Sequence, residues 1–178
     1  MPAHVTLRAA DGIPSLRSER VFPAVREALA AGSREKFRVV HWSVQRDHLH
    51  LLVEAADTRA FRSGCQGLAV RIAKAVNRRL GRHGAVWGDR YHARSLSTPR
   101  AVRTALVYVL ANWRKHVRGA RGWDPRSSAA WFDGWRTAPR PPAGPPPVVP
   151  ARTWLARVGW RRHGLVRSSE APSRSGLV

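Results

Sequence analysis

Hydrophobic and polar residues alternate along several short stretches of the chain, and this pattern predicts strands. Ala3 to Arg8 alternates like a first strand, and Lys36 to Gln45 is rich in β-forming residues. Arg46 and Asp47 follow and can form a tight turn into a third strand, which begins at His48. A fourth strand is predicted from Ala85 to Ser97. The pattern therefore predicts four strands, the second and third of which form a hairpin.

Three other stretches have the period of a helix. Ser15 to Ala31 is helical in composition, with Pro23 predicted to kink the helix or to begin its regular part, and Gly32 predicted to end it. Thr58 is the predicted N-cap of a long helix that ends near Leu80. Its apolar residues step by three or four and so share one face: Phe61, Cys65, Leu68, Ile72 and Val76. Arg71, Lys74 and Arg78 lie off that face, where we expect them to be solvated or to contact phosphate.

A third helix is predicted to open at Thr98-Pro99, with threonine as the N-cap and proline at the first helical position, and to run to about Val117. Its apolar stripe consists of Val102, Leu106, Val109, Leu110 and Trp113. The element order β-α-β-β-α-β predicts an α+β fold of the ferredoxin-like split βαβ type, an antiparallel sheet with helices on one face. The third helix lies outside this repeat and can cross the other face of the sheet.

The composition changes beyond Gly119. We expect a domain at residues 1–118, an irregular proline-rich linker at 119–150 and a basic tail at 151–178 that contains a short helix. Three interpretations of the tail stay open. It contacts DNA through arginines such as Arg161, it lies over the catalytic face and screens the site, or it packs against the domain and completes the core.

Charge indicates the kind of partner. The chain has 32 Lys and Arg residues against 11 Asp and Glu residues, a net charge of +21, so nucleic acid is the expected partner and an anionic membrane surface the weaker alternative. No apolar run is long enough to span a membrane, and no signal-peptide pattern opens the chain. The single cysteine, Cys65, excludes an intramolecular disulfide and a thiolate zinc cluster. These observations predict a cytoplasmic protein.

Two histidines in the third strand are the first candidates for chemistry. Successive residues of a strand point to opposite faces, so His48 and His50 share one face while Leu49 points to the other. Neutral histidine is the commonest metal ligand among side chains, and this pair forms a platform with two nitrogen ligands. Glu54 is a back-up oxygen ligand further along the same strand.

Tyr108 is the candidate nucleophile on the third predicted helix. On a helical wheel it lies outside the apolar stripe, with Asn112 one turn further on, so the phenol and the amide are presented together. The alternative from the helix alone is a half-exposed surface tyrosine. Tyr91 is the rival nucleophile, since it lies among the aromatic and basic residues Trp87, Arg90, His92 and Arg94, a mixture that suits base stacking and phosphate contacts on single-stranded DNA. Lys115 could hold a flanking phosphate.

Several motifs together resemble a known family. His48-Leu49-His50 resembles the His-hydrophobic-His motif of the HUH endonucleases, and Tyr108 followed by Asn112 resembles the catalytic tyrosine and amide of the single-tyrosine HUH transposases. The run from Val86 to Arg94 is similar to the REP-associated tyrosine transposase branch, as are Thr153-Trp154-Leu155 and Gly159-Trp160-Arg161. Two departures concern the helical amide, which is Asn where several relatives carry Gln, and Trp113, which stands where Pro often follows.

The resemblance implies a DNA strand transferase. Tyr108 would form a 5′-phosphotyrosine on single-stranded or hairpin DNA, and a divalent ion, Mg²⁺ or Mn²⁺, would be held by His48, His50 and Asn112. Trp87, Arg90, Tyr91, Arg94, Lys115 and Arg161 are the expected DNA contacts. The alternative is a non-catalytic or domesticated binder of structured nucleic acid. The protein is expected to act as a monomer or a homodimer.

Overall fold

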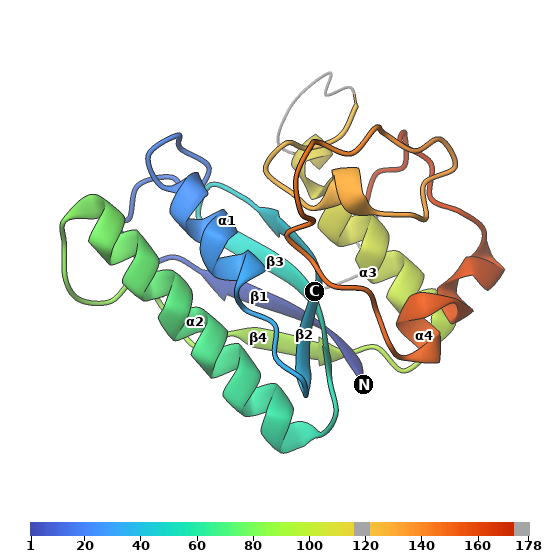
Figure 1. The fold of residues 1–178 in the computed structure, drawn as a ribbon, viewed down its shortest axis with the longest axis horizontal. Coiled ribbons are helices and arrows are strands. Elements are labelled where there is room, and N and C mark those ends of the chain that lie inside the picture. Colours follow the sequence, from blue (N-terminus) through green and yellow to red (C-terminus); the bar gives the residue numbers. More distant parts are fainter. Residues whose placement is uncertain (116–121, 173–178) are drawn as a thin grey trace.

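The fold is built on a four-stranded antiparallel sheet (Figure 1). A computed structural model describes residues 1–115 and 122–172, with Lys115 described only in its backbone. The strands are β1 (Pro2–Arg8), β2 (Phe37–Val44), β3 (His48–Ala55) and β4 (His92–Ser95), in the order β2-β3-β1-β4. This confirms the predicted α+β class and the antiparallel sheet. The histidine-bearing strand β3 lies in the interior of the sheet, between β2 and β1.

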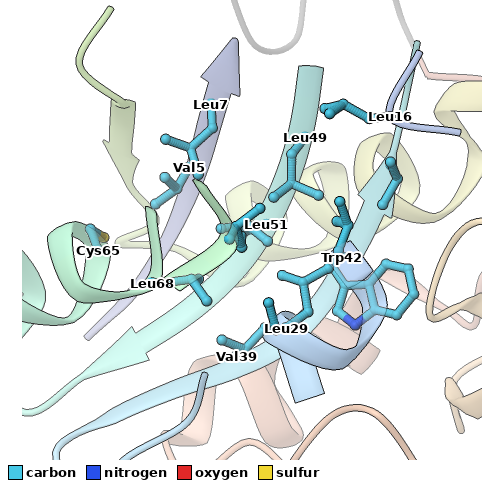
Figure 2. Close-up of a cluster of buried hydrophobic side chains, with 14 of the residues drawn as sticks. Val5, Leu7, Leu16, Leu29, Val39, Trp42, Leu49, Leu51, Cys65 and Leu68 are labelled. Atoms are coloured by element: carbon cyan, nitrogen blue, oxygen red, sulfur yellow. The ribbon is translucent and has the colours of Figure 1, made fainter. Parts of the chain in front are cut away.

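Two helices cover one face of the sheet, α1 (Phe22–Ala30) and α2 (Thr58–Leu80). The predicted apolar stripe of α2 is buried here apart from Phe61, which is partly buried, and Leu49 and Leu51 meet it from β3 (Figure 2). This register confirms the faces predicted for β3, because its even-numbered residues must then point to the opposite side.

The helix ends decide between the two alternatives for Pro23 and correct the predicted N-cap of α2. Pro23 lies in the first turn of α1, so it begins the helix and does not kink it, and Gly32 follows a C-cap at Ala31. The N-cap of α2 is Asp57 rather than Thr58, because the Asp57 carboxylate accepts the Ala60 N–H at 2.7 Å. Gly81 ends α2 with a φ of 66°, a left-handed conformation that glycine adopts without strain.

The fourth strand is much shorter than the predicted span from Ala85 to Ser97. Only His92–Ser95 pairs with β1 as a strand, apart from an isolated bridge between Ala9 and Trp87. The side chain of Val86 is buried in the core beneath α2, and the Trp87 indole N–H donates to the Ala69 carbonyl of α2 at 2.9 Å. The segment still bonds to the chain that continues β1, with the Ala10 N–H on the Val86 carbonyl at 2.9 Å and the Gly88 N–H on the Arg8 carbonyl at 3.0 Å, so the ladder is interrupted only between Gly88 and His92.

Helix α3 (Pro99–Ala111) covers the other face of the sheet, the face that the third predicted helix was expected to be able to cross. Thr98 caps it, accepting the Ala101 N–H at 3.1 Å, as predicted. The helix ends earlier than predicted and continues as the 3₁₀ turn η1 (Asn112–Lys115), while residues 116 and 117 lie outside the described residues. Trp113 is half-buried rather than part of the buried stripe.

The C-terminal third packs on the same face as α3. It contains η2 (Ala129–Trp131), α4 (Trp154–Arg157) and η3 (Gly159–His163). A second core forms between this region, α3 and the sheet, and it includes Leu52, Leu106, Phe132, Trp135 and Trp160. Trp160 is 1% exposed, which favours the interpretation of residues 151–167 as a packing segment.

The proline-rich stretch lies along the free edge of β2. The Val149 N–H donates to the Val39 carbonyl at 3.2 Å, and the Arg38 guanidinium donates to the Pro150 carbonyl. Residues 126–128 also bond to β2, through Val44 and Trp42. The boundaries predicted at residues 118 and 150 stay predictions, but the described part of this region is attached to the sheet. Within residues 1–115 and 122–172, no helix is both long and apolar enough to cross a bilayer.

Candidate functional site

The sheet and α3 bring the two histidines and Tyr108 together. His50 lies opposite Thr6 of β1 and Ser43 of β2, so its side chain points to the α3 side of the sheet. The ring centroid of His50 is 4.6 Å from that of His48 and 4.9 Å from that of Tyr108. The candidate nucleophile predicted from the helical wheel therefore contacts the predicted metal platform.

Hydrogen bonds at Nδ1 orient both imidazoles. The Nδ1 atom of His48 is 2.8 Å from the Asp47 carboxylate, and the Nδ1 atom of His50 is 3.2 Å from the Thr6 hydroxyl. The hydrogen bond from His48 holds the pKa of Asp47 below its usual value. Metal-ligating histidines commonly use their second nitrogen in this way, which leaves Nε2 as the ligating atom and fixes the plane of the ring.

Asn112 follows Tyr108 by one turn and is the C-cap residue of α3. Its side chain is 2% exposed, and neither amide atom has a hydrogen-bond partner among the residues that the structure describes. A buried amide without partners is costly, so its oxygen fits the role of a ligand for a cation.

The residues present fit a divalent ion only if an amide completes the set. Within residues 1–115 and 122–172, no three His, Cys, Asp or Glu side chains are grouped to hold a metal. Glu54 is corrected as a back-up ligand, because its carboxylate accepts the backbone N–H groups of Arg152 and Thr153 and the Thr153 hydroxyl. Two imidazoles and the Asn112 amide oxygen therefore stay the predicted donor set.

Tyr108 is half-buried, and burial raises the pKa of its phenol above the usual value of 10. At neutral pH the hydroxyl is therefore protonated. A nucleophilic attack by this oxygen needs either a group that accepts the proton or an electrophile made more reactive by nearby positive charge.

His4 is a site residue that the sequence reasoning missed. Its ring centroid lies 5.3 Å from that of His50 and 5.5 Å from that of Tyr108. Burial, together with the charge of Arg94, lowers the pKa of His4 to about 4, and its Nε2 has no hydrogen-bond partner among the described residues. The signal was present in the alternation of the first strand, which places His4 and Thr6 on one face.

The rival tyrosine lies elsewhere. Tyr91 packs against the helix-layer core, where its ring is 6.0 Å from that of Phe61 of α2. Trp87 contacts the same layer. Both side chains are thus on the side of α2, and the structure does not bring them to the histidines.

The other predicted DNA contacts are spread over the surface. Arg94 is exposed and lies opposite His4 in the β1–β4 register, beside the histidine face, and Arg90 is exposed just before β4. Arg161 pairs with Asp133 at 2.9 Å and stacks on Trp160. The side chain of Lys115 lies outside the described residues.

Comparisons with known proteins found a matching family model and a solved structure of similar fold. The family model described as "Transposase IS200 like" matches residues 13–112. The fold is similar to a solved REP-associated tyrosine transposase bound to a REP hairpin, with a TM-score of 0.55 and 19% identity, covering 71% of this chain and 75% of that one. A putative transposase from Deinococcus radiodurans R1 matches with a TM-score of 0.42 and 20% identity, covering 55% of this chain and 79% of that one. No curated protein matches the chain significantly.

Proposed function

Because the chain belongs to the family of IS200-like transposases, we propose that it cuts and rejoins one DNA strand through a covalent bond between Tyr108 and a 5′ phosphate. The observation that carries this proposal is the contact between Tyr108 and His50, with ring centroids 4.9 Å apart. A surface tyrosine with a structural role has no need of two histidines beside it, one of them 3% exposed.

The reaction exchanges a phosphodiester bond of the DNA for a phosphodiester bond to tyrosine, so the bond energy is kept for rejoining. The Tyr108 hydroxyl oxygen attacks phosphorus, the bond between phosphorus and the 3′ oxygen breaks, and the phenolic proton leaves so that a 3′ hydroxyl forms. The phosphate stays linked to the 5′ strand and to the tyrosine. Attack by another 3′ hydroxyl reverses these steps and joins two strands, so the reaction needs no nucleotide cofactor.

His48, His50 and Asn112 are the residues that would hold a divalent ion, Mg²⁺ or Mn²⁺. When bound, such an ion would polarise the scissile phosphate and neutralise the charge that develops on it. The chain's own residues supply orientation. Asp47 and Thr6 fix the two imidazoles through their Nδ1 atoms, and α3 holds the phenol against His50.

Tyr108 acts within its own chain in this proposal, because a single copy brings the tyrosine of α3 to the histidines of β3. The partner is single-stranded or hairpin DNA. The net charge of +21 supports a polyanionic partner, and a solved protein of similar fold is bound to a DNA hairpin of the REP type.

An adduct assay with two matched tyrosine variants tests the proposal. The protein is incubated with labelled hairpin oligonucleotides that carry single-stranded flanks, in Mn²⁺ or Mg²⁺, and SDS-resistant adducts are resolved by electrophoresis. Tyr108→Phe should abolish the adduct and leave DNA binding within a few-fold, because only the hydroxyl is lost. Tyr91→Phe, which removes the hydroxyl on the helix layer, should retain the adduct. The reverse pattern would overturn the choice of nucleophile, and DNA binding without an adduct in the unaltered protein would favour the non-catalytic alternative.

A further inference from the structure

A basic groove runs between α1 and α2, on the face of the molecule opposite Tyr108. It consists of two hollows of about 510 and 410 Å³. Gly67 and Arg71 line both hollows, so the two are adjacent. The helix layer that forms the groove covers the side of the sheet away from α3 (Figure 1).

Four cations of α2 line this groove. Arg59, Arg71, Lys74 and Arg78 are exposed, and among the described residues none of their side chains makes a hydrogen bond or an ion pair. Arg34 and Lys36 add positive charge at one end. The acidic lining residues are Glu27 and Asp57, and the Asp57 carboxylate already accepts the N–H of Ala60. The groove is therefore strongly positive.

The four cations lie on one stripe of α2. From Arg59 the stripe passes through Ser63 and Gly67, each four residues on, and then through Arg71, Lys74 and Arg78. At 1.5 Å per residue it extends about 28 Å, the length of roughly eight steps along one DNA strand at 3.4 Å. The small residues Ser63 and Gly67 open its middle, and a Cβ added at Gly67 would meet nothing within 4 Å.

The lining favours phosphate over an apolar partner. A helix or peptide that binds a groove by hydrophobic anchors needs apolar pockets. Of the large apolar side chains exposed among the described residues, Val70 alone lines this groove. Arginine and lysine spaced along an open channel instead match the regular negative charge of a DNA backbone.

We propose that the α1–α2 groove binds the phosphate backbone of duplex DNA, as a second contact surface remote from Tyr108. The inference takes DNA as the partner from the proposed function, but it concerns binding alone and does not require strand cleavage. A duplex in this groove and a strand at the histidines lie on opposite sides of the sheet. The connecting DNA would pass the β4 edge, where Arg90 and Arg94 are exposed.

The salt dependence of binding tests the groove. The affinity of the full chain for a labelled duplex stem is measured by anisotropy at several salt concentrations, and the slope of log K against log salt reports the number of phosphates contacted. The variant Arg71→Gln, Lys74→Gln, Arg78→Gln should reduce the slope by about 3, roughly one per lost contact. Its matched control, Arg62→Gln, Arg136→Gln, Arg140→Gln, removes the same charge from exposed residues that do not line the groove and should change the slope by less than about 1.

A pair of substitutions at one position tests the same groove without removing a cation. Gly67→Ala and Gly67→Glu both replace glycine by a residue of higher helix propensity, but only the second puts a carboxylate in the groove. We expect the alanine variant to bind duplex like the unaltered protein, and the glutamate variant to bind it several-fold more weakly.

Adduct formation by saturating single-stranded DNA should be unchanged in all these variants, since none lies at the histidine face. Equal slope losses in the groove and control triples, together with equal binding by the two Gly67 variants, would overturn the proposal. The proposal also fails if the groove triple loses affinity for labelled polyglutamate but keeps its duplex slope, because the groove would then serve an acidic protein. Unchanged groove variants in a protein that still forms the adduct refute the groove alone, whereas a protein that binds no DNA refutes the proposed function as well.

Discussion

Replacing Trp160 by alanine tests whether the C-terminal segment is part of the protein's core. Trp160 is 1% exposed, its indole N–H donates to the Ala156 carbonyl at 3.1 Å, and its ring lies 5.4 Å from that of Phe132. The ring also packs directly on the backbone of Gly134, where an added Cβ would lie 2.2 Å from it. Truncation therefore leaves a cavity that the rigid surroundings cannot close.

The expected loss is large for a single side chain. Removal of a buried tryptophan destabilises a protein by about 3–5 kcal/mol, of a total stability of about 5–15 kcal/mol. For a chain of this size each kcal/mol lowers the melting temperature by about 2–4 °C, so we expect a fall of roughly 6–20 °C. Urea unfolding followed by tryptophan fluorescence and by circular dichroism measures the free energy of unfolding directly.

Trp154, in the same segment, is the matched control. It is 49% exposed and lies beneath the Arg162 guanidinium, 4.8 Å from the ring centroid. Trp154→Ala should cost about 1 kcal/mol, mainly the loss of that cation–π contact. If Trp160→Ala loses as little free energy of unfolding as Trp154→Ala, residues 151–167 do not belong to the core, and the DNA-contacting and screening interpretations remain.

Three further predictions concern the metal platform, a buried histidine and a buried ion pair. Alanine at His48 or His50 should abolish adduct formation while the melting temperature falls by only a few degrees, and undiminished cleavage in excess EDTA would contradict a metal-assisted reaction. Burial lowers the pKa of His41 to about 3, below its unfolded value of 6.5, so the unfolded chain binds the proton more readily than the folded one. The free energy of unfolding should therefore fall by about 2 kcal/mol between pH 7 and pH 5 because of His41. Urea unfolding at the two pH values measures this fall, and His41→Gln should reduce it. Asp124→Asn should lower the free energy of unfolding by about 3 kcal/mol, because buried Asp124 pairs bidentately with Arg17 at 2.8 Å. Asp133→Asn, at the exposed pair with Arg161, should lower it by less than about 1 kcal/mol. Equal losses in the two variants would show that burial does not set the difference.

Local patterns were sufficient for the first three strands and for the faces of the two elements that carry the candidate site, whereas the choice of Tyr108 over Tyr91 came from the family resemblance. Alternation in β3 placed the histidines on one face and Leu49 and Leu51 on the other, because side-chain direction in a strand follows the chain alone. The same logic put Tyr108 outside the apolar stripe of α3. The helical wheel could not predict that this side of α3 faces the histidines, since α3 crosses the sheet through contacts between residues distant in sequence.

Contacts between residues distant in sequence also explain what the sequence analysis did not predict. The predicted fourth strand was too long because the pairing of Val86 and Trp87 with the end of the first strand is interrupted between Gly88 and His92, and composition does not mark that break. His4 was missed because its role depends on which strand pairs with β3. The linker boundaries stay predictions, but composition did not reveal that Val149 within the proline-rich stretch bonds to Val39.

The attachment of residues 126–128 and 147–150 to β2 has a consequence for association between molecules. An uncovered outer strand offers unpaired N–H and C=O groups to any other extended chain. Here the groups of Val39, Trp42 and Val44 on that side are already used within the molecule. A second copy could lengthen the sheet beside β2 only after displacing these segments. The opposite border, β4, has four residues, all exposed, which is a short template for such pairing. The chain thus covers the longer border of its sheet, partly with the proline-rich segment whose composition looked least structured, and leaves only the short border at β4 uncovered.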